Sequence, residues 1–160
     1  MFFEEFVSEL VRLTVDYSEI KVRNALSNSK ALSADVNSAF DPTFKEVFEG
    51  RNASKLGFGI VLTKYTGARG KAGASDASAE YVGKIRKLFN DKKIAWQTGE
   101  LGKVDEGGGG TVAKYLAEYN MDVLDCGPPI LAMHAPYEVS SKADVYSAYE
   151  GYKAFFGSEV

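Results

Sequence analysis

Residues 121–134 constrain the fold most, because they join a predicted buried strand to the only histidine of the chain. Alternating apolar residues up to Cys126 predict the strand. The Gly-Pro-Pro sequence at 127–129 stops it. A short apolar turn then delivers His134 just past the strand end, which is where open α/β sheets build their binding sites.

The rest of the sequence alternates between helical and strand patterns. Apolar residues at three- and four-residue steps predict helices, and short continuous apolar runs predict strands that are covered on both faces. This alternation predicts an α/β fold, in which helices pack on a mainly parallel or mixed sheet. The predicted helices cover residues 2–26, a segment from Asp41 and Pro42, and residues 77–90, 111–119 and 142–156, and the predicted strands cover residues 31–36, 59–63, 94–97 and 121–126.

The same patterns predict several local details. The glycine-containing segments 65–73 and 99–110 are predicted to be loops. Ser75 and Asp76 are predicted to cap the helix over residues 77–90. The apolar residues predicted to face inward are Phe44, Val47 and Phe48 after Pro42, and Val145, Tyr146, Tyr149, Tyr152 and Phe155 in the last helix.

Charge and composition narrow the classes of function. The formal net charge is −3, which gives no attraction to nucleic acid or to an anionic membrane. A single cysteine excludes an internal disulfide framework and a cysteine-rich zinc finger. No apolar run reaches the ~20 residues of a membrane span, and Glu4 and Glu5 stand where a secretory signal would be basic. The sequence therefore predicts a cytoplasmic protein that binds neither nucleic acid nor membrane.

Two side chains are candidate metal ligands. His134 carries a neutral imidazole, the commonest metal ligand, although a hydrogen-bonded histidine near the edge of the core would fit the same pattern. Asp35 lies at the end of a predicted strand, where it either caps a turn or offers a carboxylate ligand. A zinc site needs nitrogen and oxygen donors that converge from separate elements at ~2.0–2.2 Å. Because both residues follow strands, they could converge in one cleft.

Lys64 and the glycine-rich segment are candidate substrate contacts. Lys64 follows the predicted strand over 59–63, and it is either solvated or anchors a substrate carboxylate as a point charge. The four glycines at 107–110 precede Thr111 and a predicted helix, so backbone N–H groups could approach an anion closely. The segment lacks the Gly-Lys-Ser/Thr ending of a phosphate loop, which disfavours phosphate binding. A tight loop that lines a site and a flexible turn both stay open.

The sequence offers no clear nucleophile for covalent catalysis. Cys126 lies in the predicted buried strand without a histidine at local spacing, so we expect an inert core thiol. Ser/His/Asp catalysis would need a Gly-x-Ser-x-Gly elbow, and the sequence contains none.

Five stretches of the sequence together resemble the aspartyl aminopeptidase family, and most closely its bacterial branch. The resemblance extends in order over nearly the whole chain. It implies a three-layer αβα fold of the zinc-peptidase (phosphorylase/hydrolase-like) type, in which residues 1–160 form the C-terminal portion of a catalytic domain without a second domain. The matching stretches are residues 33–36, Asp41 with Pro42, and residues 61–67, 102–111 and 125–134.

The resemblance implies a role for each candidate residue. It makes Asp35 and His134 zinc ligands, and it places Lys64, Asp105 and the loop at Gly110 and Thr111 against the substrate. Members of this family are dinuclear zinc aminopeptidases that remove N-terminal residues from peptides, acidic residues in the best-known members. Zinc, for which cobalt or manganese could substitute, polarises the scissile carbonyl and activates a water that a glutamate deprotonates. The complete enzymes form large homo-oligomers.

The sequence also departs from the family pattern. Family members are several hundred residues long, and their other metal ligands and their catalytic glutamate would precede Phe2. Glu4 and Glu5 are not that glutamate motif, so the chain is expected to hold part of the site and no catalytic residue. Ser38 stands where eukaryotic relatives carry a substrate-contacting histidine, so strict acidic specificity is not implied. The alternative is a truncated, catalytically inactive fragment or an interaction module.

Overall fold

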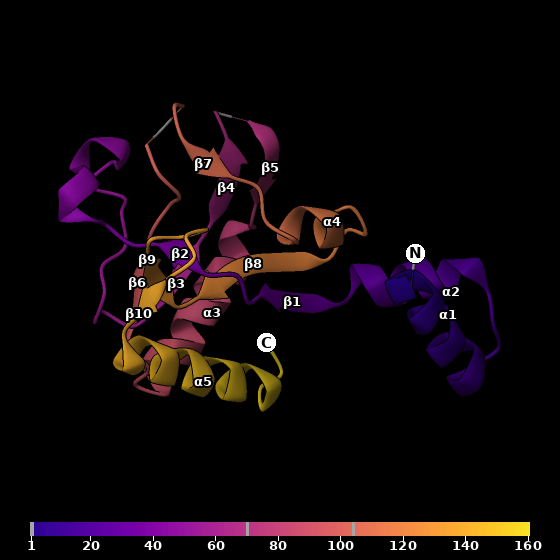
Figure 1. Cartoon of the computed structure of the whole chain (residues 1–160). Coiled ribbons are helices and arrows are strands. Elements are labelled where there is room, and N and C mark those ends of the chain that lie inside the picture. Colours follow the sequence, from indigo (N-terminus) through magenta and orange to yellow (C-terminus); the bar gives the residue numbers. More distant parts are fainter. Residues whose placement is uncertain (1, 70, 104) are drawn as a thin grey trace.

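A four-stranded mixed sheet organises the molecule, in the strand order β1-β8-β3-β6 (Figure 1). A computed structural model describes residues 2–69, 71–103 and 105–160, so Met1, Gly70 and Val104 lie outside the described residues. β8 pairs in parallel with β1 and antiparallel with β3, and β3 pairs in parallel with β6. The α/β class with mixed sheets is therefore as predicted. The strands are β1 (Lys30–Ser33), β3 (Ile60–Thr63), β6 (Trp96–Thr98) and β8 (Asp122–Gly127).

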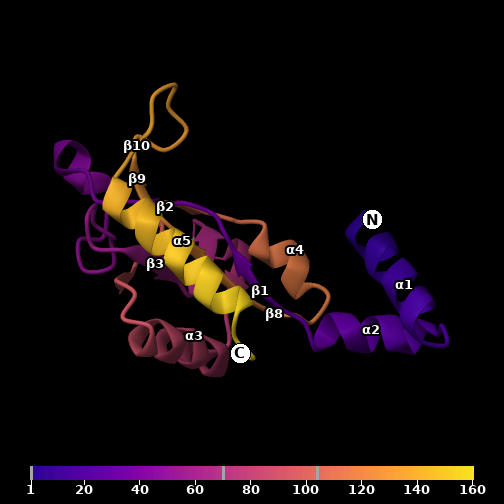
Figure 2. The ribbon, with the colours of Figure 1, turned by 90° about the horizontal axis from the view of Figure 1, so that it is seen from below.

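Two long helices, α3 (Ala79–Asp91) and α5 (Lys142–Phe156), pack on one face of this sheet and contact each other. Figure 2 shows α5 lying across the sheet with α3 beside it. The hydroxyls of Ser78 and Ser141 cap these helices by accepting backbone N–H groups of their first turns. The core between sheet and helices contains Ile60, Leu62, Ala77, Tyr81, Ile85, Phe89, Leu124, Cys126 and Ala148.

The opposite side of the central sheet carries shorter elements. In Figure 1, α4 (Ala113–Ala117) lies above β8, on the side away from α5. One small sheet has the order β10-β9-β2, from β10 (Val139–Ser140), β9 (Pro129–Leu131) and β2 (Asn37–Ser38). The other has the order β5-β4-β7, from β5 (Ala72–Asp76), β4 (Tyr65–Ala68) and β7 (Gly108–Gly109). These short elements carry the candidate site.

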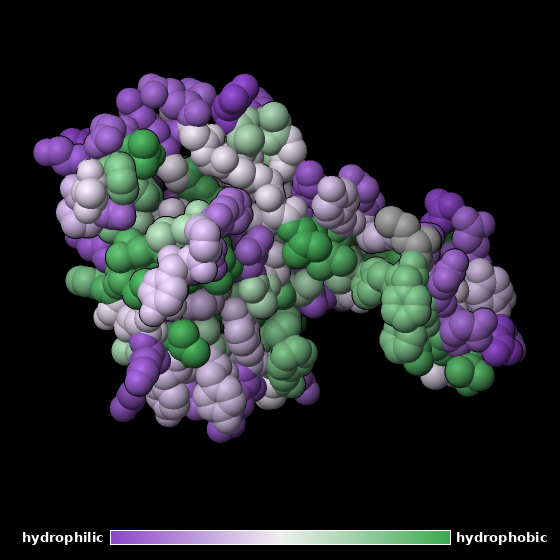
Figure 3. Space-filling view, in the orientation of Figure 1, coloured by the Kyte–Doolittle hydropathy of each residue, from purple (hydrophilic) through white to green (hydrophobic). Residues whose placement is uncertain are grey.

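The N-terminal residues form a helical arm that extends away from the body (Figures 1 and 2). The single helix predicted over residues 2–26 is two helices, α1 (Phe2–Thr14) and α2 (Glu19–Ser27), because Ser18 caps a new helix start by accepting the Lys21 N–H. The arm has its own small cluster of Val11, Val22 and Leu26. Many of its other apolar side chains are exposed, including Phe2 at 82% and Leu13 at 70%, and Figure 3 shows this hydrophobic surface.

The predicted loop over residues 65–73 is wrong, because most of it belongs to the hairpin of β4 and β5. Ser75 and Asp76 lie in β5 and do not cap α3. The hairpin gives no alternating pattern, since small residues fill it and backbone pairing holds it together. The third strand of this sheet, β7, approaches β4 closely as well, because a Cβ on Gly108 would lie 2.2 Å from the Gly67 carbonyl oxygen.

The predicted inward face of α5 is wrong in part. Val145, Tyr146 and Tyr149 are exposed, whereas the small Ala148 and Gly151 are buried. A Cβ on Gly151 would lie 3.1 Å from the Phe89 ring, so the small residues allow α5 to pack closely on α3.

The helix predicted after Asp41 is short and is not an α-helix. It is the 3-10 helix η1 (Pro42–Val47), in which Asp41 is the N-cap as predicted, while Phe44 and Val47 are exposed.

Asp144 fixes the start of α5 to the loop before β3. Its side chain is fully buried, and its two carboxylate oxygens accept the N–H groups of Gly57 and Gly59, each at 2.7 Å. The position in the first helical turn also suits a negative charge, since the N-terminal end of a helix is partially positive.

Among the described residues, no helix is both long and apolar enough to cross a membrane.

The Cys126 thiol should not react with Ellman's reagent in the folded protein. Its side chain is fully buried, and burial raises the pKa of the thiol, so the nucleophilic thiolate is scarce. We expect one thiol equivalent to appear only after denaturant is added, with the same midpoint as the loss of circular dichroism. Rapid labelling without denaturant would contradict the packing of β8.

Candidate functional site

An open cleft of about 530 Å³ brings together four of the predicted site residues, Asp35, Gly110, Thr111 and His134. They come from three separate segments: the end of β1, the glycine segment before α4, and the loop between β9 and β10. Asp35 and His134 therefore line one cleft, and their role as metal ligands stays a prediction.

Asp35 lies two residues beyond the end of β1. One carboxylate oxygen accepts the Val36 N–H at 2.9 Å, so the side chain does cap its own turn. The other oxygen has no hydrogen-bond partner among residues 2–69, 71–103 and 105–160, which leaves it free for a cation. The backbone here packs tightly on β8, because a Cβ on Gly127 would lie only 1.9 Å from the Asp35 carbonyl oxygen. Gly127 thereby sets the position of Asp35.

His134 sits in a strained loop. The residues predicted as a turn after Gly127 include β9, so His134 follows this strand and not β8 directly. Ala132 and His134 have φ values of 57° and 65°, a region that costs non-glycine residues about 1–3 kcal/mol each. The loop is held at its ends by the pairing of β9 with β10, and the His134 N–H donates to Glu138 Oε1 at 2.6 Å. The imidazole is exposed, with no protein hydrogen bond in the described part of the chain.

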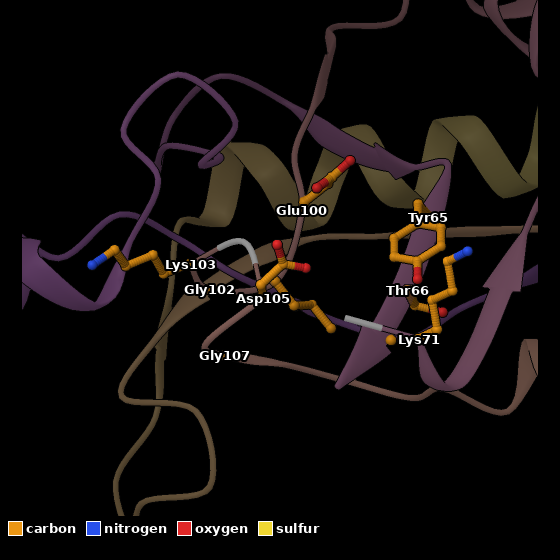
Figure 4. Close-up of a pocket in the computed structure, with 10 residues that line it drawn as sticks. Tyr65, Thr66, Lys71, Glu100, Gly102, Lys103, Asp105 and Gly107 are labelled. Atoms are coloured by element: carbon orange, nitrogen blue, oxygen red, sulfur yellow. The ribbon is translucent and has the colours of Figure 1, made fainter. Parts of the chain in front are cut away.

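Asp105 lines a second hollow, of about 270 Å³, that adjoins the cleft. The two spaces share Leu101, Gly102 and Gly107 as walls. In Figure 4, Asp105 lies across the hollow from Tyr65, whereas the Lys103 side chain extends away from it. Asp105 has a φ of 62°, so the backbone turns tightly where this residue lines the hollow.

Lys64 is not in the cleft. Its exposed side chain forms an ion pair with Asp76 across the start of the β4-β5 hairpin. It lines a separate small hollow with Thr98 and Glu100, and Glu100 also lines the hollow of Asp105. An exposed ion pair of this kind contributes at most about 1 kcal/mol, so the Lys64 ammonium can exchange Asp76 for another anion.

Sequence reasoning assigned no role to Asp125, a carboxylate buried in the middle of β8. Burial raises the pKa of Asp125, and the charge of Asp35 raises it too, whereas the hydroxyls of Ser33, Thr111 and Thr66 lower it. The Thr111 hydroxyl donates to Asp125 Oδ2 at 2.8 Å. One signal was visible in the sequence, since Asp125 stands between the apolar residues Leu124 and Cys126 of a predicted buried strand, but the strand alone does not show which groups surround it.

The described residues fit part of a zinc site. A carboxylate and an imidazole are donors that zinc accepts, but a zinc ion usually has three or four protein ligands. Among the described residues, no group of three or more His, Cys, Asp or Glu side chains is arranged to hold a metal ion. Asp35 and His134 could therefore serve only together with ligands from elsewhere.

Known proteins resemble this chain over nearly its whole length. Residues 1–156 match the family described as aminopeptidase I zinc metalloprotease (M18). A probable M18 family aminopeptidase 1 of Clostridium acetobutylicum is 54% identical over 157 residues, which are 98% of this chain and 34% of the relative. The crystal structure of an M18 family aminopeptidase from Thermotoga maritima matches with a TM-score of 0.90 at 44% identity, over 96% of this chain and 34% of that chain.

The chain spans about a third of the length of these relatives. A structure from S. cerevisiae, described as a dodecamer, matches with a TM-score of 0.66 at 24% identity. It covers 84% of this chain and 28% of that chain, and at this identity the likeness concerns the fold alone.

Proposed function

The chain belongs to the aminopeptidase I zinc metalloprotease (M18) family, and from this premise we propose that it supplies part of the two-zinc site of a metalloaminopeptidase. The substrate would be a peptide from which an N-terminal residue, in some cases an acidic one, is removed by hydrolysis. The observation that carries the proposal is the meeting of Asp35 and His134 in one cleft from distant parts of the sequence.

In this proposal each candidate residue has a distinct task. Asp35 and His134 hold zinc, which when bound polarises a scissile carbonyl and activates a water. The segment at Gly110 and Thr111 lines the same cleft and borders the peptide. Asp105 contacts substrate that extends into the adjoining hollow, and Lys64 anchors a substrate carboxylate after releasing Asp76. This chain contributes no catalytic residue, so the general base comes from outside these 160 residues.

The architecture of the complete enzyme is also part of the proposal. We infer that residues 1–160 are the C-terminal portion of a three-layer αβα catalytic domain and contain no second domain of their own. Support comes from the third of the relatives' length that the chain spans and from the helices on both sides of its central sheet. A homo-oligomer is proposed for the complete enzyme. Three further statements stay predictions: the use of cobalt or manganese, a cytoplasmic location, and the absence of nucleic-acid and membrane partners.

His134→Ala should weaken zinc binding at least about 10-fold, since only one donor of the proposed pair would remain. Isothermal titration with zinc measures this in the complete enzyme, where this chain is joined to the remaining ligands. Tyr137→Ala is the matched control, because Tyr137 is 82% exposed in the same loop and its phenol is not a proposed ligand. Equal zinc affinity in wild type and His134→Ala would count against ligation by His134.

The second candidate function, an inactive fragment or interaction module, is favoured by the incomplete donor set. A two-metal site must hold its ions ~3.5–4 Å apart, and two protein ligands do not suffice for that. We therefore expect the isolated 160 residues to release no aspartate or glutamate from peptide anilides, with zinc or cobalt added. Chelator-sensitive release by the purified chain would refute this expectation. Zinc binding that depends on His134 would favour the proposal of a partial enzyme over that of an interaction module.

A further inference from the structure

Three buried side-chain oxygens near the cleft lack a hydrogen-bond partner among the described residues: Asp125 Oδ1, Ser33 Oγ and Thr66 Oγ1. Their residues are 6%, 3% and 2% exposed, so bulk water does not solvate them. Unpaired polar atoms in such positions are costly, and native proteins retain few of them. Their occurrence together calls for a common explanation.

The hydroxyls of Ser33 and Thr66 lie beside the carboxylate to which the third oxygen, Asp125 Oδ1, belongs. Ser33 in β1 is the register partner of Asp125 in β8. The hydroxyls of Ser33 and Thr66 lie near enough to lower the pKa of Asp125, although neither contact has the geometry of a hydrogen bond. Thr111 makes the one well-formed bond, from its hydroxyl to Asp125 Oδ2 at 2.8 Å. The carboxylate of Asp125 therefore collects hydroxyls from three different segments.

Each of these hydroxyls belongs to a segment that forms the candidate site. Ser33 is two residues before Asp35 on the same strand end. Thr66 lines the hollow shown in Figure 4, and Thr111 directly follows the glycine segment that borders the cleft. A movement of Asp125 would therefore displace all three segments.

We propose that Asp125 is a positioning residue, whose buried carboxylate holds the Asp35 turn, the β4 hairpin and the glycine segment in register with one another. Stability alone explains Asp125 less well than Asp144, because one carboxylate oxygen of Asp125 is buried without a hydrogen bond among the described residues, and a buried unpaired acceptor is costly. Fixing the site explains it better, because oriented hydroxyls can anchor three chain segments at once. Only the link to metal affinity rests on the proposed function.

Amide hydrogen exchange of the metal-free chain tests the positioning directly. Asp125→Asn and Thr111→Val should each speed exchange at residues 107–110 about 10-fold or more, while amides of α3 and α5 keep their rates. Thr111→Ser, which retains the hydroxyl, should restore wild-type rates at 107–110. Asp122→Asn is the matched control on the same strand, because Asp122 lies at the start of β8 and accepts a hydrogen bond from the Ser78 hydroxyl instead, so α5 serves as the reference in this variant.

The outcomes separate positioning from a general structural role. Unchanged exchange at 107–110 in Asp125→Asn and Thr111→Val would overturn the proposal, as would a uniform rise over the whole chain. If Asp125→Asn does not fold, the Thr111→Val and Thr111→Ser pair decides, and failure of serine to restore the rates would overturn it.

Zinc titration adds a second measurement. Asp125→Asn should lower zinc affinity about 10-fold, as is typical for groups that support metal ligands from behind. Unchanged zinc affinity would overturn the part of the proposal that concerns Asp35. A complete enzyme that contains this chain and binds no zinc would defeat the proposed function, whereas the exchange rates of the metal-free chain would still decide whether Asp125 positions the three segments.

Discussion

Asp144→Ala should lower the free energy of unfolding by about 3 kcal/mol or more, the largest effect that we expect from a single side-chain truncation. The carboxylate of Asp144 makes two hydrogen bonds, to the N–H groups of Gly57 and Gly59, and each bond to a charged group is worth about 1.5–3 kcal/mol. Alanine would leave both N–H groups without an acceptor and would detach the start of α5 from the loop before β3. Equilibrium unfolding in urea, followed by circular dichroism, measures the loss.

Asp91→Ala is the matched control for this prediction. Asp91 also lies on a helix, but it is exposed, and among the described residues its ion pair is with Lys87. Exposed pairs of this kind contribute about 0.3–0.5 kcal/mol, so Asp91→Ala should be nearly neutral. Similar losses in the two variants would mean that the buried carboxylate does not carry the stability assigned to it.

Gly127→Ala should disturb both stability and the proposed metal site. The new Cβ would lie 1.9 Å from the Asp35 carbonyl oxygen and 2.7 Å from its carbonyl carbon, and both are backbone atoms that cannot rotate away. The turn at Asp35 must therefore move, and overpacking of this kind costs about 1–3 kcal/mol. Because the same movement displaces a proposed ligand, we also expect zinc affinity to fall.

Gly83→Ala is the control substitution at a glycine without such a contact. Gly83 lies inside α3, and a Cβ there would meet no atom within 4 Å. Alanine at this position should stabilise the protein by about 0.5–1 kcal/mol, since glycine is a poor helix residue. Urea unfolding and zinc titration of both variants provide the comparison. Unimpaired stability and zinc affinity in Gly127→Ala would show that the β8 contact does not place Asp35.

The elements that the sequence predicted well are those with a strong local signal. The apolar runs of β3 and β8 predicted buried strands, and the structure buries both. The last helix runs over the predicted residues 142–156, because Ser141 caps it at one end and Gly157 ends it at the other. The family also followed from the sequence, since its motifs are read directly from consecutive residues.

The elements that the sequence missed have their cause in distant contacts. The β4-β5 hairpin consists mostly of small and polar residues, so its pairing depends on backbone hydrogen bonds that leave no apolar pattern. The inward face of α5 was misjudged because three bulky apolar side chains point outward, while Ala148 and Gly151 meet α3. In both cases the shape of the neighbouring element determines which residues pair or become buried. That shape is not encoded within the segment itself.

By itself, the sequence determined the α/β class, the family and the residues that could carry chemistry. It did so because periodicity, helix caps and motifs depend on neighbouring residues. Only the tertiary structure decided that Asp35 and His134 share a cleft, that Lys64 lies outside it, and that Asp125 collects hydroxyls beneath it. These relations depend on strand order and register, which bring distant residues together through contacts that no short stretch of the sequence specifies.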